Sequence, residues 1–172
     1  MIYNLRSLIS LEPISPISAS AFKVVHLSAL RESPTAFGST YERESQFSDA
    51  EWSNRASACT RDGFVGYLAM EAGIGCGIAR VTPDNQDSGV AWLESMWVAP
   101  SHRRDGIGCM LVSKILAWAR GRGMSAVKLS VTSSNEPAFC FYKRLGFRLT
   151  GRTEPYPNDP ALVELEMLLP LA

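Results

Sequence analysis

Residues 91–122 read AWLESMWVAPSHRRDGIGCMLVSKILAWARGR, and this stretch decides how the chain folds. Residues 91–98 are mostly bulky or apolar, as in a buried strand. Pro100 ends that strand, because proline has no amide hydrogen to donate to a neighbouring strand. After Gly108, apolar residues recur at the spacing of one helix face: Met110, Leu111, Ile115, Leu116 and Trp118. The pattern therefore predicts a strand, a turn at residues 103–108 and a helix over residues 106–120.

The turn between this strand and this helix has the features of an anion site. The first amides of a helix lack partners inside the helix, and their dipoles favour an anion. Gly106 and Gly108 have no Cβ, so a ligand can approach the backbone closely. Arg103 and Arg104 add positive charge at the same place. The sequence therefore predicts that this turn binds a phosphate or pyrophosphate group.

Two common phosphate motifs do not match the turn. A P-loop needs Gly-Lys-Ser or Gly-Lys-Thr, and the chain contains neither. A dinucleotide fingerprint needs Gly or Ala where Leu111 stands, and Lys128 occupies the region where an acidic residue would bind the ribose. A glycine-containing loop with two solvated arginines stays open as the alternative.

Two motifs together resemble the GNAT N-acetyltransferases. Val98-Ala99-Pro100 followed by residues 103–108 (RRDGIG) resembles the R/Q-x-x-G-x-G/A acetyl-CoA motif of that family. Asn135, Ala138 and residues 141–147 (FYKRLGF) resemble its N-x-x-A-x-x-F-Y-x-x-x-G-F signature. The two motifs occur in the order and at the spacing of the family. The resemblance covers residues 64–149, and the first 60 residues match only loosely.

This resemblance implies a fold and a set of contacts to acetyl-CoA. The implied fold is α/β, a single domain over residues 1–172, with a mixed, mostly antiparallel sheet of about seven strands and about four flanking helices. The fourth and fifth strands are expected to splay apart. The implied pantetheine contacts come from the backbone of Met96, Trp97 and Val98 and from Asn135. The implied pyrophosphate contacts come from Arg103, Arg104, Asp105, Gly106, Ile107, Gly108 and Cys109.

Acetyl transfer from a thioester to an amine needs a neutral amine, a donor for the oxyanion and a proton for the leaving thiolate. The resemblance implies Glu94 as the general base or as the group that orients the ammonium, with Glu71 as a weaker substitute. It implies Tyr142 as the general acid beside the coenzyme sulfur. Glu94 on a solvated strand face and Tyr142 as a helix anchor remain as alternatives. A covalent route through Cys109 lacks an activating histidine.

The predicted elements follow the order β-α-α-β-β-β-α-β-α-β-β. The predicted strands lie at residues 2–9, 64–72, 76–81, 89–98, 126–132, 147–151 and 162–169. The predicted helices lie at residues 18–31, 48–59, 106–120 and 135–145. Ser48 and Glu51 form a capping box at the start of the second helix. We expect a hairpin turn at residues 73–75 and a polar, proline-rich loop over residues 153–160.

Composition limits the class of partner. The chain is 46% hydrophobic, as in a globular protein, and its 17 basic and 17 acidic residues give a net charge of zero, which argues against a nucleic-acid partner. The four cysteines form no CxxC pair, and with two histidines they predict no metal site. Scattered cysteines, no signal-peptide pattern and no long apolar run predict a cytoplasmic protein without membrane contact.

The sequence thus predicts an acetyl-CoA-dependent N-acetyltransferase that acts by direct transfer on a primary amine of a small molecule. A protein N-terminal or lysine acetyltransferase, a non-catalytic acyl-CoA-binding module and, more distantly, a nucleotide-binding domain stay as alternatives. The sequence leaves the oligomeric state open, and the resemblance is compatible with a homodimer. It also leaves the acyl-chain preference undecided. Residues 33–60 and 153–160 would select the acceptor. Within them Glu42, Glu44, Asp49 and Glu51 either attract a cation or form a solvated helix face.

Overall fold

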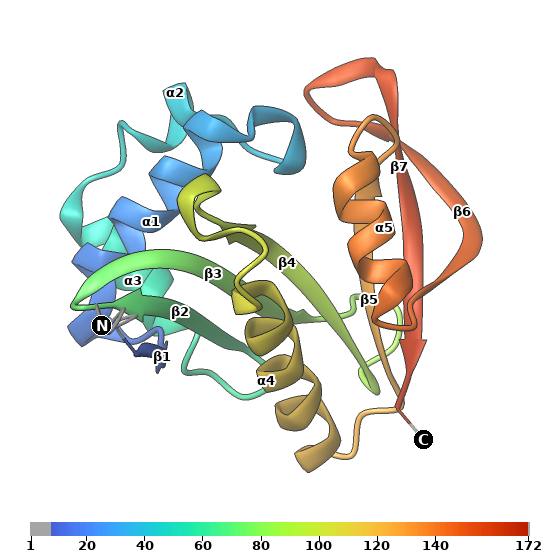
Figure 1. Ribbon diagram of the computed structural model, residues 1–172, viewed down its shortest axis with the longest axis horizontal. Coiled ribbons are helices and arrows are strands. Elements are labelled where there is room, and N and C mark those ends of the chain that lie inside the picture. Colours follow the sequence, from blue (N-terminus) through green and yellow to red (C-terminus); the bar gives the residue numbers. More distant parts are fainter. Residues whose placement is uncertain (1–7, 172) are drawn as a thin grey trace, which may run out of the picture.

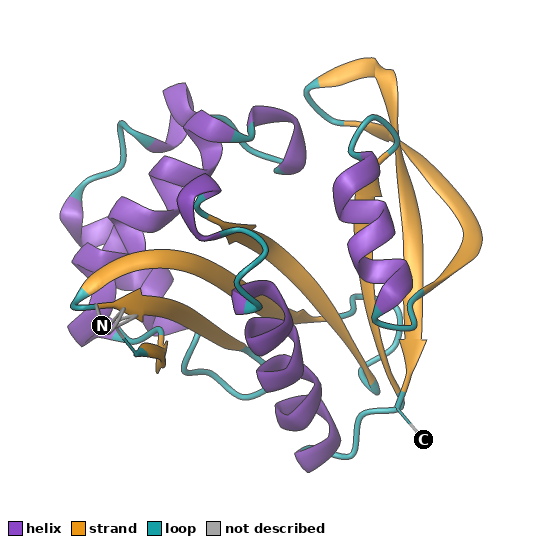
Figure 2. Cartoon of the chain, viewed as in Figure 1, coloured by secondary structure: helices purple, strands orange, loops and turns teal. Residues whose placement is uncertain are grey.

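The computed structural model describes residues 8–171, and a seven-stranded sheet runs through them in the order β1-β2-β3-β4-β5-β7-β6 (Figures 1 and 2). Neighbouring strands are antiparallel except for the parallel pair β4 and β5. The strands are β1 (Ile9–Pro13), β2 (Val65–Glu71), β3 (Ile74–Pro83), β4 (Val90–Val98), β5 (Ala126–Thr132), β6 (Arg148–Tyr156) and β7 (Asp159–Pro170). The predicted mixed, mostly antiparallel sheet is therefore confirmed.

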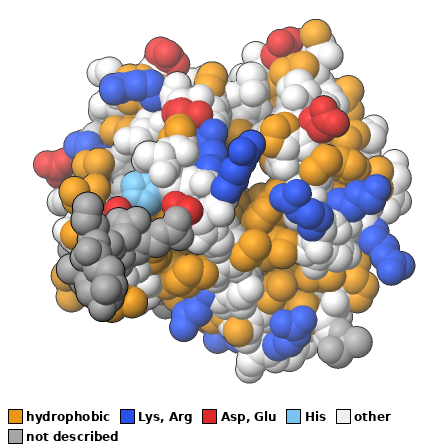
Figure 3. Space-filling view, viewed as in Figure 1, with side chains coloured by type: hydrophobic (Ala, Val, Ile, Leu, Met, Phe, Trp, Pro, Cys, Tyr) orange, Lys and Arg blue, Asp and Glu red, His pale blue; other side chains and the backbone are white. Residues whose placement is uncertain are grey.

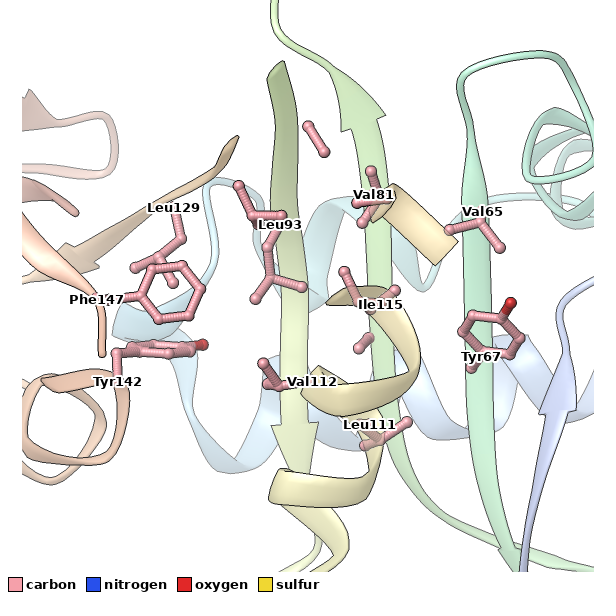
Figure 4. Packing of buried hydrophobic residues seen from close by; sticks show 14 of the residues in the cluster. Val65, Tyr67, Val81, Leu93, Leu111, Val112, Ile115, Leu129, Tyr142 and Phe147 are labelled. Atoms are coloured by element: carbon pink, nitrogen blue, oxygen red, sulfur yellow. The ribbon is translucent and has the colours of Figure 1, made fainter. Parts of the chain in front are cut away.

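Helices cover both faces of this sheet. They are α1 (Ala19–Glu32), α2 (Tyr41–Glu44), α3 (Asp49–Ala58), α4 (Ile107–Gly121) and α5 (Glu136–Arg144). One hydrophobic cluster joins α4 and α5 to one face, and a second joins α1 and α3 to the other (Figure 1). Figure 4 shows Leu111, Val112 and Ile115 of α4 over side chains of β2, β3 and β4. Short 3-10 turns occupy Pro16–Ser18, Pro34–Ala36 and Pro100–His102.

β4 and β5 pair only at their starts. Val90 opposes Ala126, Ala91 opposes Val127, and Trp92 opposes Lys128. Beyond Trp92 the two strands diverge, as Figure 1 shows. The splay that the family resemblance implied is therefore present, and it leaves the end of β4 without a ladder partner on its β5 side.

A β-bulge interrupts β4 where the splay opens. The pairing with β3 jumps from Arg80 opposite Glu94 to Ile78 opposite Trp97, and Ser95 has a φ of 52°. An extra residue in one strand reverses which face the following side chains occupy. Glu94 precedes the bulge and alternates with Leu93, so it lies on the α1 face, whereas Met96 after the bulge lies on the α4 face.

The side chains of β4 belong to different hydrophobic clusters before and after the bulge, in agreement with this change of face. Before the bulge, Ala91 and Leu93 belong to the cluster under α4. After it, Met96 and Val98 pack against that same cluster, and Trp97 enters the cluster under α1. The sequence analysis treated residues 89–98 as one regular strand and did not predict the bulge.

Two predicted boundaries at the start of the sheet were wrong. β1 covers Ile9–Pro13, so it runs beyond the predicted end at residue 9 and does not include residue 8, while residues 2–7 of the predicted strand fall outside the described part. Pro13 is tolerated because β1 is an edge strand, where a missing amide hydrogen costs no sheet bond. The hairpin turn consists of Ala72 and Gly73, both with positive φ (49° and 82°), since Glu71 already pairs with Ile74.

The loop predicted at residues 153–160 was also wrong. β6 continues to Tyr156, and β7 begins at Asp159. Pro155 is paired with Val163 in an edge strand, where it need not donate a hydrogen bond. The one-turn helix α2, capped by Thr40, was likewise not predicted. The capping box of Ser48 and Glu51 at the start of α3 is confirmed.

Candidate active site

Two pockets meet where β4 and β5 diverge. A groove of about 850 Å³ lies on the α4 and α5 face, and a pocket of about 390 Å³ lies on the face of α1, α2 and α3. Figure 3 shows a hollow between the helical half of the molecule and the half that carries β5 to β7. Residues that line both are Ala36, Met96, Asn135, Ala138 and Tyr142. The splay thus connects the two faces of the sheet.

One end of the groove is the start of α4. Gly106 is the N-cap and has a φ of 84°, a left-handed conformation that glycine adopts at little cost. The first helical hydrogen bond of this turn runs from Met110 N to Gly106 O at 3.0 Å. The amides of Ile107, Gly108 and Cys109 therefore precede the helical ladder and carry the positive end of the helix dipole.

The predicted phosphate-binding residues do not all reach this groove. Its lining includes Arg103, Arg104, Gly106, Gly108 and Cys109. Asp105 does not line it, and the side chain of Ile107 is 1% exposed in the core. Ile107 is likewise absent from the groove lining, and its side chain belongs to the core.

Arg103 is held by a carboxylate from the opposite side of the sheet. Its Nη2 donates to Glu32 Oε2 at 2.5 Å, and its Nε donates to the Val98 carbonyl at 2.9 Å. Trp97 Nε1 also donates to Glu32 Oε2, at 2.9 Å. Burial alone would raise the pKa of Glu32, but hydrogen bonds from Ser33, Trp97 and Arg103 outweigh it and lower that pKa. The end of α1 is thereby joined to the turn at residues 103–108.

The side wall of the groove is the splayed end of β4 together with α5. Met96, Trp97 and Val98 line it. Asn135 lines it too and is the N-cap of α5, where its Oδ1 accepts a hydrogen bond from Ala138 N at 3.2 Å. Asn135 thus caps α5, and its position beside both pockets is compatible with the predicted contact to the pantetheine arm.

Tyr142 stands at the junction of the two pockets. Its side chain is 7% exposed and packs edge-on against Phe141 and Phe147. In Figure 4 its hydroxyl points away from α5 toward β4, and no hydrogen bond joins it to another residue of the described chain. Burial raises the pKa of Tyr142, so the phenol keeps its proton well above neutral pH.

Glu94 lines the pocket on the α1 face. Its Oε1 lies 3.4 Å from Arg80 Nη2, and its side chain is 35% exposed. Glu71, the weaker candidate for a base, lines neither pocket and lies 2.9 Å from His102 Nε2. Of these two carboxylates, only Glu94 lines the pocket that Tyr142 also lines.

The same pocket contains a buried charged cluster that the sequence analysis did not identify. Glu44 is 4% exposed and accepts hydrogen bonds from Arg55 Nη1 at 2.6 Å and from His26 Nε2 at 3.0 Å. Burial alone would raise the pKa of Glu44, but the hydrogen bonds from His26 and Arg55 lower it to about 2. Burial lowers the pKa of His26, so this ring is neutral at pH 7. Glu42, Asp49 and Glu51, by contrast, are exposed.

Residues 34–39 close over this pocket. Thr132 Oγ1 of β5 donates to the Thr35 carbonyl at 2.6 Å, and the Tyr156 hydroxyl of β6 donates to the Phe37 carbonyl at 2.6 Å. Ala36, Phe37, Gly38 and Ser39 line the pocket beneath these bonds. The segment after α1 is therefore tied to the strands on the far side of the splay.

Sequence reasoning missed much of the pocket wall because its residues come from separate elements. The missed charged and titratable residues are His26, Arg55, Arg80, Glu154 and Glu164. No motif links them, and alternation along β3, β6 and β7 alone does not say which face opens into a cavity. Among residues 8–171, no group of three or more His, Cys, Asp or Glu side chains is arranged to hold a metal ion. No helix in that range is long and apolar enough to span a membrane.

The family resemblance is matched by direct comparison with known proteins. A sequence model described as the acetyltransferase (GNAT) family matches residues 27–147. Streptothricin acetyltransferase from Streptomyces lavendulae is 42% identical over 59 residues, which are 34% of this chain and 31% of that protein. The peptidyl-lysine N-acetyltransferase YjaB of Salmonella typhimurium is 37% identical over 71 residues, 38% of this chain and 46% of that protein.

These curated relatives are matched over less than half of their own length. Among solved structures, yncA from Salmonella typhimurium with its cofactor acetyl-CoA superposes with a TM-score of 0.79. That match covers 96% of this chain and 95% of the other at 19% identity, and it establishes likeness of fold.

Proposed function

This chain belongs to the acetyltransferase (GNAT) family, and we propose that it transfers an acetyl group from acetyl-CoA directly to a primary amine of a small molecule. One observation carries the proposal. The groove behind the phosphate-binding turn and the pocket that holds Glu94 meet at Tyr142, where β4 and β5 diverge. A thioester in the groove and an amine in the pocket would meet at that junction.

The groove fits the chemistry of acetyl-CoA. The free amides at the start of α4 and the guanidinium groups of Arg103 and Arg104 suit a pyrophosphate. The end of β4 has no strand partner on its β5 side, so Met96 and Val98 can bond an extended pantetheine arm as an added strand would. Acetyl-CoA supplies the acetyl thioester when bound.

The residues at the junction can meet the remaining demands of the reaction. Glu94 takes the proton of the attacking amine, directly or through water. Ser95 and Met96 lie outside the pairing with β3, so the amide of Met96 is the assigned donor to the oxyanion. Tyr142 keeps its proton at neutral pH and gives it to the departing thiolate.

The pocket favours a small acceptor. Its volume is about 390 Å³, and residues 34–39 are tied across it by hydrogen bonds from Thr132 and Tyr156. A folded protein surface would have to pass this segment to reach Glu94. A peptidyl-lysine acceptor is the competing proposal, because YjaB of Salmonella typhimurium, a relative in sequence, carries that name.

The test has two steps. Calorimetric titration should show that acetyl-CoA and its product CoA bind, and that NAD and ATP bind far more weakly. Thiol release is then followed with a panel of small primary amines and with lysine-containing peptides. Failure to bind acetyl-CoA would overturn the proposal. Binding without turnover of any amine would leave an acyl-CoA-binding module, and faster turnover of peptides would identify a peptidyl acceptor.

A further inference from the structure

The acceptor pocket has an excess of negative charge. Its lining contains four carboxylates, those of Glu44, Glu94, Glu154 and Glu164, and two guanidinium groups, those of Arg55 and Arg80. His26 also lines it but is neutral at pH 7, because burial lowers its pKa. A pocket with this balance attracts a cation with more than one positive charge.

The excess is located on β6 and β7. Glu44 is bonded to Arg55 and His26, and Glu94 lies beside Arg80. Glu154 and Glu164 instead face each other as direct partners in the β6–β7 ladder. Neither carboxylate has a hydrogen bond or ion pair with another residue of the described chain.

Two like charges directly opposite each other destabilise a sheet unless a counter-charge lies between them. Burial raises the pKa of Glu164, and the nearby Glu154 raises it further. Thr132 is the partner of Glu164 on β5, and with Ser130 it adds hydroxyl groups to the same wall. This wall has the carboxylates and hydroxyls that bind an organic ammonium group.

A second polar group without a partner lies in the wall of the same pocket. His26 is 3% exposed and lines the pocket from α1, and its Nδ1 is buried without a hydrogen-bond partner among residues 8–171. Its Nε2 faces the Glu44 carboxylate, so Nε2 carries the proton of the neutral ring and Nδ1 is an acceptor. His26 therefore leaves one unsatisfied acceptor in the α1 wall of the pocket, beside the unpaired carboxylates of β6 and β7.

We propose that the acceptor is a diamine or a longer polyamine. One of its amines is acetylated beside Glu94, while a second ammonium group is bound by Glu154 and Glu164. This proposal rests on the proposed function and names its substrate class. In the reaction the new N–C bond forms as the C–S bond of the thioester breaks, Glu94 takes the amine proton, and Tyr142 protonates the thiolate. The second ammonium keeps its proton and its charge throughout.

The test compares matched amines and matched variants. The probes are 1,4-diaminobutane, spermidine and n-butylamine, which share a reacting primary amine and differ in their second charge. The variants are the double substitution Glu154→Gln with Glu164→Gln, and Glu166→Gln, a carboxylate on β7 that does not line the pocket. In the wild type, kcat/KM for the diamines should exceed that for n-butylamine by about tenfold or more, as expected for a charge-assisted hydrogen bond.

The double variant should lower kcat/KM for the diamines to the level of n-butylamine, mainly through KM, while its affinity for acetyl-CoA shows that it is folded. Glu166→Gln should keep the diamine preference. Equal kcat/KM for diamines and n-butylamine in the wild type, or an equal loss in Glu166→Gln, would overturn the proposal.

A second readout does not depend on turnover. Without acetyl-CoA, 1,4-diaminobutane should raise the Tm of the wild type more than n-butylamine does, and this difference should vanish in the double variant. If no amine is acetylated but this difference is present, the proposed reaction fails and the diammonium site stands. If amines are acetylated but the difference is absent, the reaction stands and the diammonium site is wrong.

Discussion

Gly108 of α4 lies directly against Phe141 of α5. A Cβ added at Gly108 would stand 3.1 Å from Phe141 Cζ and 3.4 Å from Met96 Cε. Gly106, by contrast, has no atom within 4 Å of its Cβ position. The glycine at position 108 therefore permits close packing of α4 against α5 and β4, in addition to its position at the turn that we propose binds pyrophosphate.

Gly108→Val should therefore affect both stability and binding. Forcing a larger side chain into this contact costs about 1–3 kcal/mol of unfolding free energy, and displacement of Phe141 should weaken acetyl-CoA binding. Urea unfolding and calorimetry measure the two effects. Gly121→Ala is the matched control in the same helix, because nothing lies within 4 Å of its Cβ position. Wild-type stability in Gly108→Val would show that the contact with Phe141 is not restrictive.

Tyr142→Phe should lower turnover far more than acetyl-CoA affinity. The hydroxyl points into the junction and keeps its proton, so its loss removes the proton donor to the thiolate, an effect of roughly a hundredfold in kcat. Calorimetry should give nearly the same Kd for acetyl-CoA. Tyr67→Phe is the control, since Tyr67 is buried on β2 and lines neither pocket. Parallel losses of turnover and binding in Tyr142→Phe would mean that the tyrosine only anchors α5.

The turn and the two helix starts beside the groove could be predicted from the sequence because their signals are local. The turn at residues 103–108 and the start of α5 at Asn135 each depend on a few consecutive residues whose backbone needs are visible in the sequence. The order of the strands followed from alternation and turn residues. These features could be derived without knowledge of distant contacts.

The acceptor side could not be derived in this way. The bulge at Ser95 puts Met96 on the opposite face from Glu94, yet serine carries no signal for a positive φ. Residues 153–160 have the polar, proline-rich composition of a loop, but pairing with β7 places Glu154 in a ladder. The local sequence pattern around Glu44 is that of an exposed residue, and its burial depends on contacts with Arg55 and His26. Tertiary contacts decide each of these features.

Glu94→Gln should reduce kcat by roughly a hundredfold or more while acetyl-CoA affinity stays near that of the wild type. The amide cannot accept the amine proton, although it preserves the size of the side chain. The difference in kcat between the wild type and Glu94→Gln should become smaller at high pH, where more of the amine is already neutral. Glu71→Gln provides the comparison, because Glu71 lies beside His102 and outside both pockets. A larger loss in Glu71→Gln than in Glu94→Gln would transfer the role of base to Glu71.

Glu44 should make the stability of the protein depend on pH in the acid range. Its pKa is about 2 in the folded protein against 4.5 for the free side chain, because hydrogen bonds from His26 and Arg55 outweigh burial. The unfolded chain therefore binds the proton first as the pH falls. The contribution of Glu44 is complete above pH 4.5 and is lost as the pH falls from 4.5 toward 2, by up to roughly 3 kcal/mol.

Glu44→Gln should accordingly be less stable than the wild type near neutral pH, since it leaves Arg55 without its carboxylate partner, and the two proteins should converge in acid. Urea unfolding followed by tryptophan fluorescence over this pH range measures the difference. Glu42→Gln is the matched control, because Glu42 is exposed on the same helix. If the unfolding free energies of the wild type and Glu44→Gln differ by a constant amount down to the lowest pH, the ion pair does not determine the stability in acid.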